Sequence, residues 1–222
     1  MRRREFLTLS AASVGGLLVY SLQGQPLRLA AQEQTLRISL RFFTEQEALI
    51  VAAAAARIFP SDDSGPGAHE AGVVIYIDRQ LAGPYGKDRY RYTQPPFEDG
   101  KPELGYQGKA TPREIYRETI KTLEGFDHLT PNRQDEILVG MQTTTFFRLL
   151  RTHTIEGMFC DPVHGGNVGM IGWQLIGYPG PRMSNVLDVD THFGQLFRPK
   201  PASLQEVTRL FGRPFRPSED EQ

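Results

Sequence analysis

The sequence predicts a mainly α-helical protein: a single helical domain with long loops and a glycine-rich C-terminal third, preceded by an N-terminal twin-arginine signal peptide. Two observations predict the helices. Threonines stand before helix-like windows, followed by proline or, three residues on, by glutamate. Proline- and glycine-rich stretches separate these windows. Residues 35–222 suffice for one domain with a hydrophobic core and are too few for two full-sized domains.

The first expected helix covers about 45–59. Thr44 and Glu47 form a capping box, in which the threonine oxygen accepts from the third helical amide and the glutamate reaches back to the threonine amide. Five consecutive alanines at 52–56 favour the helix and allow a neighbouring element to approach closely. Residues 60–67, with proline, glycine and two aspartates, end it.

A second helix is expected over 68–81, where apolar residues recur on one side. Gly72 and the β-branched run 73–77 leave a short strand open as an alternative.

Residues 83–110 lack periodicity and are rich in proline and tyrosine. A loop of this length inside a compact domain is usually functional or disordered, and its aromatic content argues against plain disorder. Its tyrosines suit a surface that lies on another protein, although they could equally pack back on their own domain. The candidate contact residues here are Tyr85, Tyr90, Tyr92 and Tyr106.

Four further helices are expected. Thr111-Pro112 starts one that runs to about Leu123, because threonine caps the helix and proline suits its first position. Thr130-Pro131 repeats this start ahead of a helix over 134–140. Whether this helix joins the next one is left open. The remaining windows are 144–157 and, more weakly, 203–210.

Residues 1–34 are read as a twin-arginine signal peptide and linker. The apolar run Leu7–Leu22 is shorter than the roughly 20 residues that span a bilayer and is diluted by serine and glycine. We expect removal near Ala31, whereas retention would leave an N-terminal anchor. The residues that carry the signal are Arg3, Arg4, Phe6 and Leu7.

Composition argues against nucleic acid as a partner and excludes an internal disulfide. The net charge is −1 and basic residues are scattered, so no electrostatic footprint for nucleic acid is present. Cys160 is the only cysteine, so no internal disulfide can form. Its thiol is either buried as a small hydrophobe or available to a partner or metal.

Polar residues between 153 and 164 raise two catalytic alternatives. A continuing helix would place His153, Glu156 and Cys160 on one side, which allows a metal site. Asp161 and His164 lie just beyond. Against it, no established zinc-ligand spacing occurs and Asp161-Pro162 ends the helix. A Cys160–His164 nucleophile pair lacks any sign of an oxyanion hole.

Several motifs together resemble one protein family, the small subunit (subunit 3, or gamma) of membrane-bound gluconate 2-dehydrogenase. The resemblance lies in the string His153–Asn167 (HTIEGMFCDPVHGGN), in Gly172-Trp173 and 176–180 (IGYPG), and in the earlier 67–78 (GAHEAGVVIYID). One departure is His164, where the family pattern leads us to expect an aromatic residue.

The resemblance implies a heteromer: an FAD-dependent large subunit that oxidises a sugar or sugar acid, a multi-haem cytochrome c subunit, and this small non-catalytic subunit. FAD and haem c are then expected in the partners, with no cofactor bound by this chain. The small subunit would carry the large one, folded, through the twin-arginine translocase to the periplasm, peripheral to the inner membrane.

Two segments form the surface expected to contact the large subunit: the tyrosine-rich loop, 83–106, and the glycine-rich segment, 161–180. Trp173 and Tyr178 are its expected anchors. Two rivals stay open: an exported enzyme that acts alone through His153, Glu156, Asp161 or His164, and a stand-alone scaffold of the same fold. Residues of the glycine-rich segment that belong to this expected surface are Asp161, Pro162, Gly165, Gly166, Asn167, Trp173, Tyr178 and Pro179.

Overall fold

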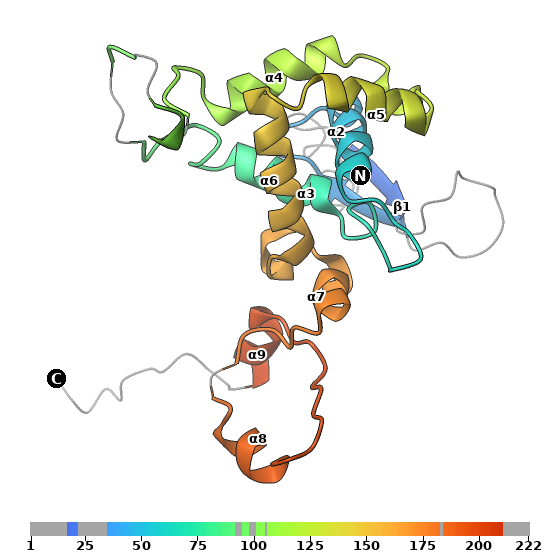
Figure 1. The fold of residues 1–222 in the computed structure, drawn as a ribbon, viewed down its shortest axis with the longest axis vertical. Helices are drawn as coiled ribbons and strands as arrows, with labels where there is room; N and C mark the ends of the chain where they lie inside the picture. Colours follow the sequence, from blue (N-terminus) through green and yellow to red (C-terminus); the bar gives the residue numbers. More distant parts are fainter. Residues whose placement is uncertain are drawn as a thin grey trace, which may run out of the picture.

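The protein is described by a computed structural model that covers residues 17–21, 35–91, 95–97, 101–104, 106–182 and 184–210. It is mainly helical, as predicted (Figure 1). The elements are β1 (Leu17–Ser21), β2 (Thr35–Ser39), α2 (Glu45–Ile58), α3 (Val73–Ala82), η2 (Pro102–Leu104), α4 (Pro112–Thr122), η3 (Phe126–His128), α5 (Pro131–Gly140), α6 (Thr145–Phe159), η4 (Pro162–His164), η5 (Val168–Met170), α7 (Ile171–Ile176), α8 (Val186–Thr191) and α9 (Leu204–Leu210).

The two strands form an antiparallel pair at the N-terminal side. Leu17 faces Ser39 and Ser21 faces Thr35 in the register. Strand β1 therefore uses residues inside the segment 1–34, which the sequence analysis reads as a leader. The pairing does not test export or cleavage, and the division into 1–34 and 35–222 stays a prediction.

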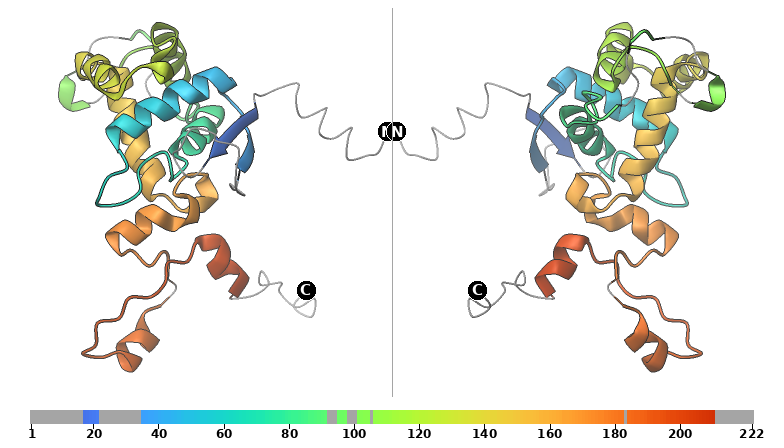
Figure 2. Two further views of the ribbon diagram at one scale, coloured as in Figure 1. Left: turned by 90° about the vertical axis from the view of Figure 1, so that its right-hand side faces the viewer. Right: turned by 90° about the vertical axis from the view of Figure 1, so that its left-hand side faces the viewer.

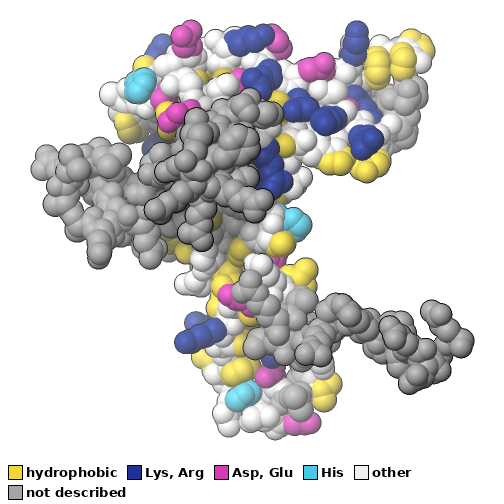
Figure 3. Space-filling view, turned by 180° about the vertical axis from the view of Figure 1, so that it is seen from behind, with side chains coloured by type: hydrophobic (Ala, Val, Ile, Leu, Met, Phe, Trp, Pro, Cys, Tyr) yellow, Lys and Arg dark blue, Asp and Glu magenta, His cyan; other side chains and the backbone are white. Residues whose placement is uncertain are grey.

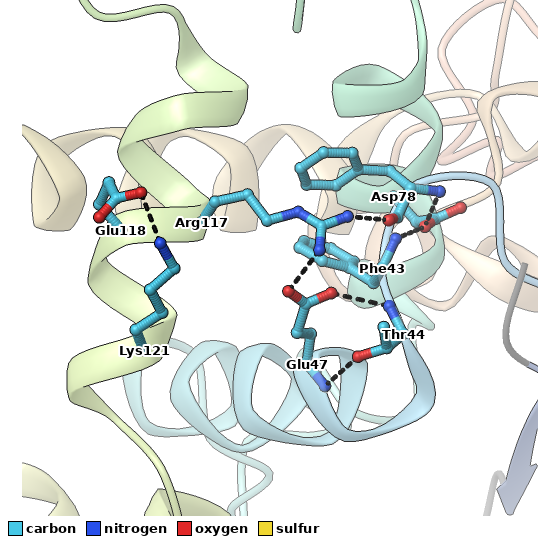
Figure 4. Close-up of polar contacts among 8 residues, drawn as sticks. Phe43, Thr44, Glu47, Asp78, Arg117, Glu118 and Lys121 are labelled. Carbon is cyan, nitrogen blue, oxygen red and sulfur yellow. Dashed lines mark hydrogen bonds and ion pairs between the residues drawn. The ribbon is translucent and has the colours of Figure 1, made fainter.

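Helix α2 confirms the predicted capping box. The Thr44 side chain accepts from the Glu47 amide, and Glu47 Oε2 accepts from the Thr44 amide at 2.8 Å. The other oxygen of Glu47 accepts from Arg117 of α4 at 2.7 Å (Figure 4). One carboxylate thus caps α2 and ties it to a helix that lies far away in the sequence.

Helix α3 starts later than predicted, at Val73 instead of residue 68. Gly72 precedes it with φ +65°, a left-handed conformation that glycine adopts without a Cβ penalty and that separates the helix from the turns before it. The strand considered over 73–77 does not form, since these residues open the helix.

Helices α4, α5 and α6 begin where threonine predicted them. Thr111 and Glu114 form the second capping box, and the Thr144 side chain accepts from the Phe147 amide. Thr130 precedes α5 without a side-chain cap bond. The junction of α5 with α6 does not form, because a turn at 141–144 separates them.

The core lies between α2, α3, α4 and α6 (Figures 1 and 2). Alanines of α2 are buried there, which matches the predicted close approach. Asp78 of α3 is buried in this core, and its carboxylate accepts three backbone amides, from Arg41, Phe42 and Phe43, at 2.8–2.9 Å. It fixes the chain just before α2.

The C-terminal part leaves this helical body. Helix α7 lies within the glycine-rich segment, 161–180. A loop that contains α8 then projects away from the body before the chain returns to α9 (Figures 1 and 2). The short helices α7 and α8 were not predicted, whereas the weak window at 203–210 appears as α9. Among the described helices, none is long and apolar enough to cross a membrane.

Candidate docking surface

The projecting loop is closed at its base. We call residues 181–201 the arm. Its ends meet because the Ala202 amide donates to the Pro179 carbonyl at 3.1 Å. The Leu204 amide donates to Asp161 Oδ2 at 2.7 Å, which fixes the returning chain to the glycine-rich segment. The arm is therefore held at one place and free to extend beyond it.

Gly180 makes this closure sterically feasible. Its φ is +85°, and a Cβ at this position would overlap the carbonyl oxygen of Ala202 and touch the Trp173 ring. Only glycine lets the two chain segments approach so closely with this backbone conformation.

The glycine-rich segment forms the platform under the arm. Asn167 has φ +48° and is fully buried; its amide group donates to the Cys160 carbonyl and its oxygen accepts from the Gly172 amide, both at 2.8 Å. Trp173 is 3% exposed and donates its ring N–H to the Phe159 carbonyl at 2.7 Å. These side chains hold α6 and α7 together.

Several residues that were expected to contact a partner are buried in this chain. Trp173, Asn167, Gly165 and Gly166 lie inside this chain, so they shape the platform and are not accessible to a partner in this conformation. Tyr178 is exposed and packs edge-on against Trp173, with ring centroids 5.2 Å apart. The positions that are partly exposed are Asp161, Pro162 and Pro179.

The arm and the helix before it carry unburied apolar side chains. Phe193 and Leu196 are each 85% exposed. Within the arm, Arg182 pairs with Asp188, and His192 stacks on Phe197 with ring centroids 3.8 Å apart. Figure 3 shows apolar side chains spread over this part of the molecule. The exposed members are Leu175, Ile176, Tyr178, Val186, Val189, Phe193, Leu196, Phe197 and Leu204.

The tyrosine-rich loop forms a second feature, on the helical body. Tyr85 and Tyr106 line a groove of about 320 Å³ with Leu104, Ile115 and Leu149. The Tyr106 hydroxyl accepts from the Ala110 amide at 3.0 Å. Each of the two tyrosines packs on its own chain and keeps an exposed edge, and their contact with another protein stays a prediction. Tyr90 is largely exposed, and Tyr92 lies outside the described residues.

A buried histidine links this loop to the core. His153 of α6 is 1% exposed, and its two ring nitrogens are hydrogen-bonded to the hydroxyls of Tyr85 and Tyr116, each at 2.8 Å. Burial lowers the pKa of His153 to about 4. Burial also raises the pKa of Tyr85 to about 12 and that of Tyr116 well above its ordinary value. All three groups are neutral near pH 7, and the histidine has no nitrogen left for a substrate.

The residues considered for metal binding or catalysis are used structurally. Glu156 accepts from the Tyr76 hydroxyl at 2.9 Å, and the Asp161 carboxylate accepts the amides of Val163 and Leu204. Burial raises the pKa of the Cys160 thiol to about 11, which disfavours a nucleophilic thiolate. Within the described ranges, no three His, Cys, Asp or Glu side chains are grouped to hold a metal ion.

Sequence reasoning missed the arm. In this part of the chain the sequence predicted one weak helix, at 203–210, and no periodicity marks residues 181–201. The available signal was composition, since several large apolar residues stand among prolines and polar residues there without a helical or strand pattern. The export residues Arg3, Arg4, Phe6 and Leu7 lie outside the described residues, so the structure does not test them.

Comparison with known proteins places most of the body in one family. The model of the family described as gluconate 2-dehydrogenase subunit 3 matches residues 45–180, which is more than half of the chain and ends at the base of the arm. No significant match was found among curated proteins or solved structures. The matched range contains α2 to α7 and the platform described above. The chain therefore belongs to the gluconate 2-dehydrogenase subunit 3 family.

Proposed function

We propose that this chain is a non-catalytic accessory subunit that binds the FAD-dependent large subunit of a sugar or sugar-acid dehydrogenase, stabilises it and carries it through the twin-arginine translocase. FAD and haem c would reside in partner chains, the latter in a multi-haem cytochrome c that delivers electrons to the inner membrane. The mature complex would be periplasmic and peripheral to that membrane.

One observation supports a binding role most strongly: the apolar surface that runs from Leu175 on α7 over the arm. Contiguous exposed apolar patches larger than a few hundred Å² mark interaction sites on soluble proteins. An aromatic side chain alone buries about 150–250 Å² when it is covered, and Phe193 is 85% exposed. The arm could thus supply a substantial share of the roughly 800 Å² per partner that a stable interface buries.

Membership of the family supports a partner chain as the occupant of this surface. A subunit 3 belongs to an assembly with other subunits, and covering an apolar surface that is exposed in the isolated chain stabilises both partners by mass action. His153 is buried, and its ring nitrogens and the carboxylates of Glu156 and Asp161 are all hydrogen-bonded, which fits a scaffold better than a catalytic site.

Export by this chain can be tested through its N-terminal arginines. We would co-express the chain with a candidate FAD-dependent dehydrogenase large subunit and replace Arg3 and Arg4 together by lysine. The proposal expects FAD-loaded large subunit in the periplasm with the wild-type chain and its retention in the cytoplasm with the variant. Periplasmic dehydrogenase activity that is unchanged by the variant would refute the carrier role.

A further inference from the structure

We propose that Tyr85 is an acid-sensitive cover over the buried imidazole of His153: when His153 takes up a proton, the Tyr85 ring turns away and lets water reach the imidazole. The groove of about 320 Å³ that Tyr85 lines would then open toward the core. Every group involved belongs to this chain, and the device goes beyond the proposed function without depending on it.

The hydrogen bonds of His153 assign its neutral tautomer. A neutral imidazole has one N–H donor and one acceptor nitrogen. Tyr116 is 0% exposed, and among the described residues its hydroxyl bonds only to His153 Nδ1. This hydroxyl must donate, because its proton would otherwise lack an acceptor in the core. Nε2 therefore carries the imidazole proton and donates to the hydroxyl of Tyr85, which is 42% exposed and can turn its own O–H toward solvent.

A second proton on His153 is incompatible with this arrangement. It would sit on Nδ1 and point at the Tyr116 oxygen, so the Tyr116 hydroxyl would have to accept instead of donate. The hydroxyl proton would then have no acceptor, beside a buried positive charge, and both cost free energy. Burial accordingly lowers the pKa of His153 to about 4. Acid therefore favours a conformation in which water reaches the imidazolium.

The elements around His153 supply no free buried counter-ion within the described ranges. The buried residues of α2 are apolar, those of α4 are Pro112, Tyr116 and Ile120, and α7 has no titratable residue. The remaining carboxylates have other partners: Glu156 of α6 bonds the Tyr76 hydroxyl, Asp78 of α3 holds three amides, and Asp88 pairs with Arg91. Relief of the buried charge must therefore come from solvent.

Tyr85 is the side of the contact that can move. The Tyr116 ring is fully buried and packs edge-on against Phe146, with ring centroids 5.2 Å apart. The Tyr85 ring lies at the surface and meets the His153 ring edge-on, with centroids 5.4 Å apart. The backbone of the neighbouring Gly86 is held by hydrogen bonds to α3 and to α4. The Tyr85 side chain can thus turn while its backbone stays in place.

Hydroxyl-radical footprinting of the full chain, read by mass spectrometry, measures how often the His153 side chain meets solvent. Uptake of one proton shifts the opening equilibrium by up to about tenfold per pH unit, so we expect modification at least about fivefold faster at pH 4.5 than at pH 7. His128, whose side chain is 78% exposed, corrects for the effect of pH on histidine chemistry. Phe43 is 1% exposed and should stay protected unless the whole body unfolds.

Variants test whether Tyr85 is the cover and His153 the sensor. Tyr85→Ala should expose His153 already at pH 7, with modification at least about fivefold faster than in the wild type. Tyr106→Ala is the matched control, because Tyr106 lines the same groove and is 41% exposed; it should leave His153 protected at pH 7. Glu156→Gln and Asp88→Asn remove the carboxylates whose charge acts on Tyr85, and the acid response should persist in both.

Nitrogen-15 NMR of the imidazole at pH 7 tests the assigned tautomer without any variant. Nε2 should be protonated and Nδ1 should not. A proton on Nδ1 instead would remove the reason for opening and overturn the proposal.

The footprinting results also decide against the proposal in three cases. These are a His153 that stays protected at pH 4.5, a His153 that stays protected in Tyr85→Ala, and an acid response that disappears in either carboxylate variant. Modification of His153 and Phe43 at the same pH would likewise overturn it, since the whole body would then unfold and no cover would move. None of these results depends on a partner chain, so the proposed function is tested separately.

Discussion

The helical body and the arm differ in where they place their apolar side chains. In the body, Phe43, Tyr116 and Leu150 are almost fully buried, and the polar groups among them are hydrogen-bonded. In the arm, Phe193 and Leu196 are 85% exposed. Apolar burial is the dominant favourable term in folding, so the body is stabilised by its own contacts, while the arm gains that term only when something covers it.

One chain thus combines a body with a buried core and an arm whose apolar side chains are exposed. A carboxylate holds backbone amides in each region: Asp78 in the body and Asp161 at the base of the arm. In the body Asp78 fixes a segment that is already covered by packing. At the arm Asp161 fixes only the base, and the apolar side chains of Phe193 and Leu196 stay exposed.

The largest expected difference in unfolding free energy comes from removing one carboxylate in the body and one in the arm. Asp78→Ala leaves three amides, two of them buried, without an acceptor and should lower the free energy of unfolding by about 3–5 kcal/mol. Asp190→Ala on the exposed part of the arm should change it by less than about 0.5 kcal/mol. Urea unfolding followed by circular dichroism measures both. Equal costs would remove the distinction between body and arm.

Acid should destabilise the body through His153. Its pKa is about 4 in the folded chain, below the ordinary value of 6.5, so the unfolded chain takes up the proton first as pH falls. The stability that the neutral histidine contributes is present above pH 6.5 and is lost as pH falls toward 4, by about 3 kcal/mol. Urea unfolding between pH 7 and pH 4 measures this loss.

His153→Gln is the control, since glutamine keeps a donor and an acceptor without a titratable ring. The variant should lack the His153 component of the acid destabilisation. A variant whose stability falls with pH as steeply as that of the wild type would show that the buried histidine is not its source.

Gly180→Ala should loosen the arm more than the body. The added Cβ overlaps the Ala202 carbonyl, and alanine is strained at positive φ, together costing about 1–2 kcal/mol at the base. We expect faster proteolysis within 181–201 and a nearly unchanged rate of cleavage in the body. Gly194→Ala is the matched control, because it has φ +71° but nothing within 4 Å of the added atom. If both variants are cleaved at the same rate, closure at the base is not what restrains the arm.

Phe193→Ala should have the smallest effect on the isolated chain, less than about 0.5 kcal/mol, since its ring makes little contact with the rest of the protein. Phe126→Ala in the core checks the sensitivity of the measurement and should cost about 3 kcal/mol or more. Thermal unfolding of the purified chain decides this point. A large loss at Phe193 would mean that the arm packs on itself in solution.

Local signals in the sequence predicted much of the body. The capping boxes at Thr44 and Thr111 act within four residues, so their pattern is readable without the fold, and the helices begin where they indicate. The start of α3 was misplaced because the left-handed conformation of Gly72 depends on its surroundings.

Contacts between distant residues could not be read in this way. Asp78 accepts amides about 36 residues earlier in the chain, and Tyr85 meets His153 across 68 residues. No local pattern encodes either pairing. The platform was located from the resemblance to the family, but the burial of Trp173 and the exposure of Phe193 depend on tertiary packing. The arm lies outside the matched range and carries no periodic signal, so its projection was not predictable.

Hydrogen exchange of the chain, alone and in the presence of the proposed FAD-dependent large subunit, tests the central claim most directly. The account predicts that amides of 184–201 exchange quickly in the free chain and at least about tenfold more slowly in the complex, while amides of α2, α3 and α6 change little. Protection confined to the body, with the arm exchanging equally fast in both states, would contradict it.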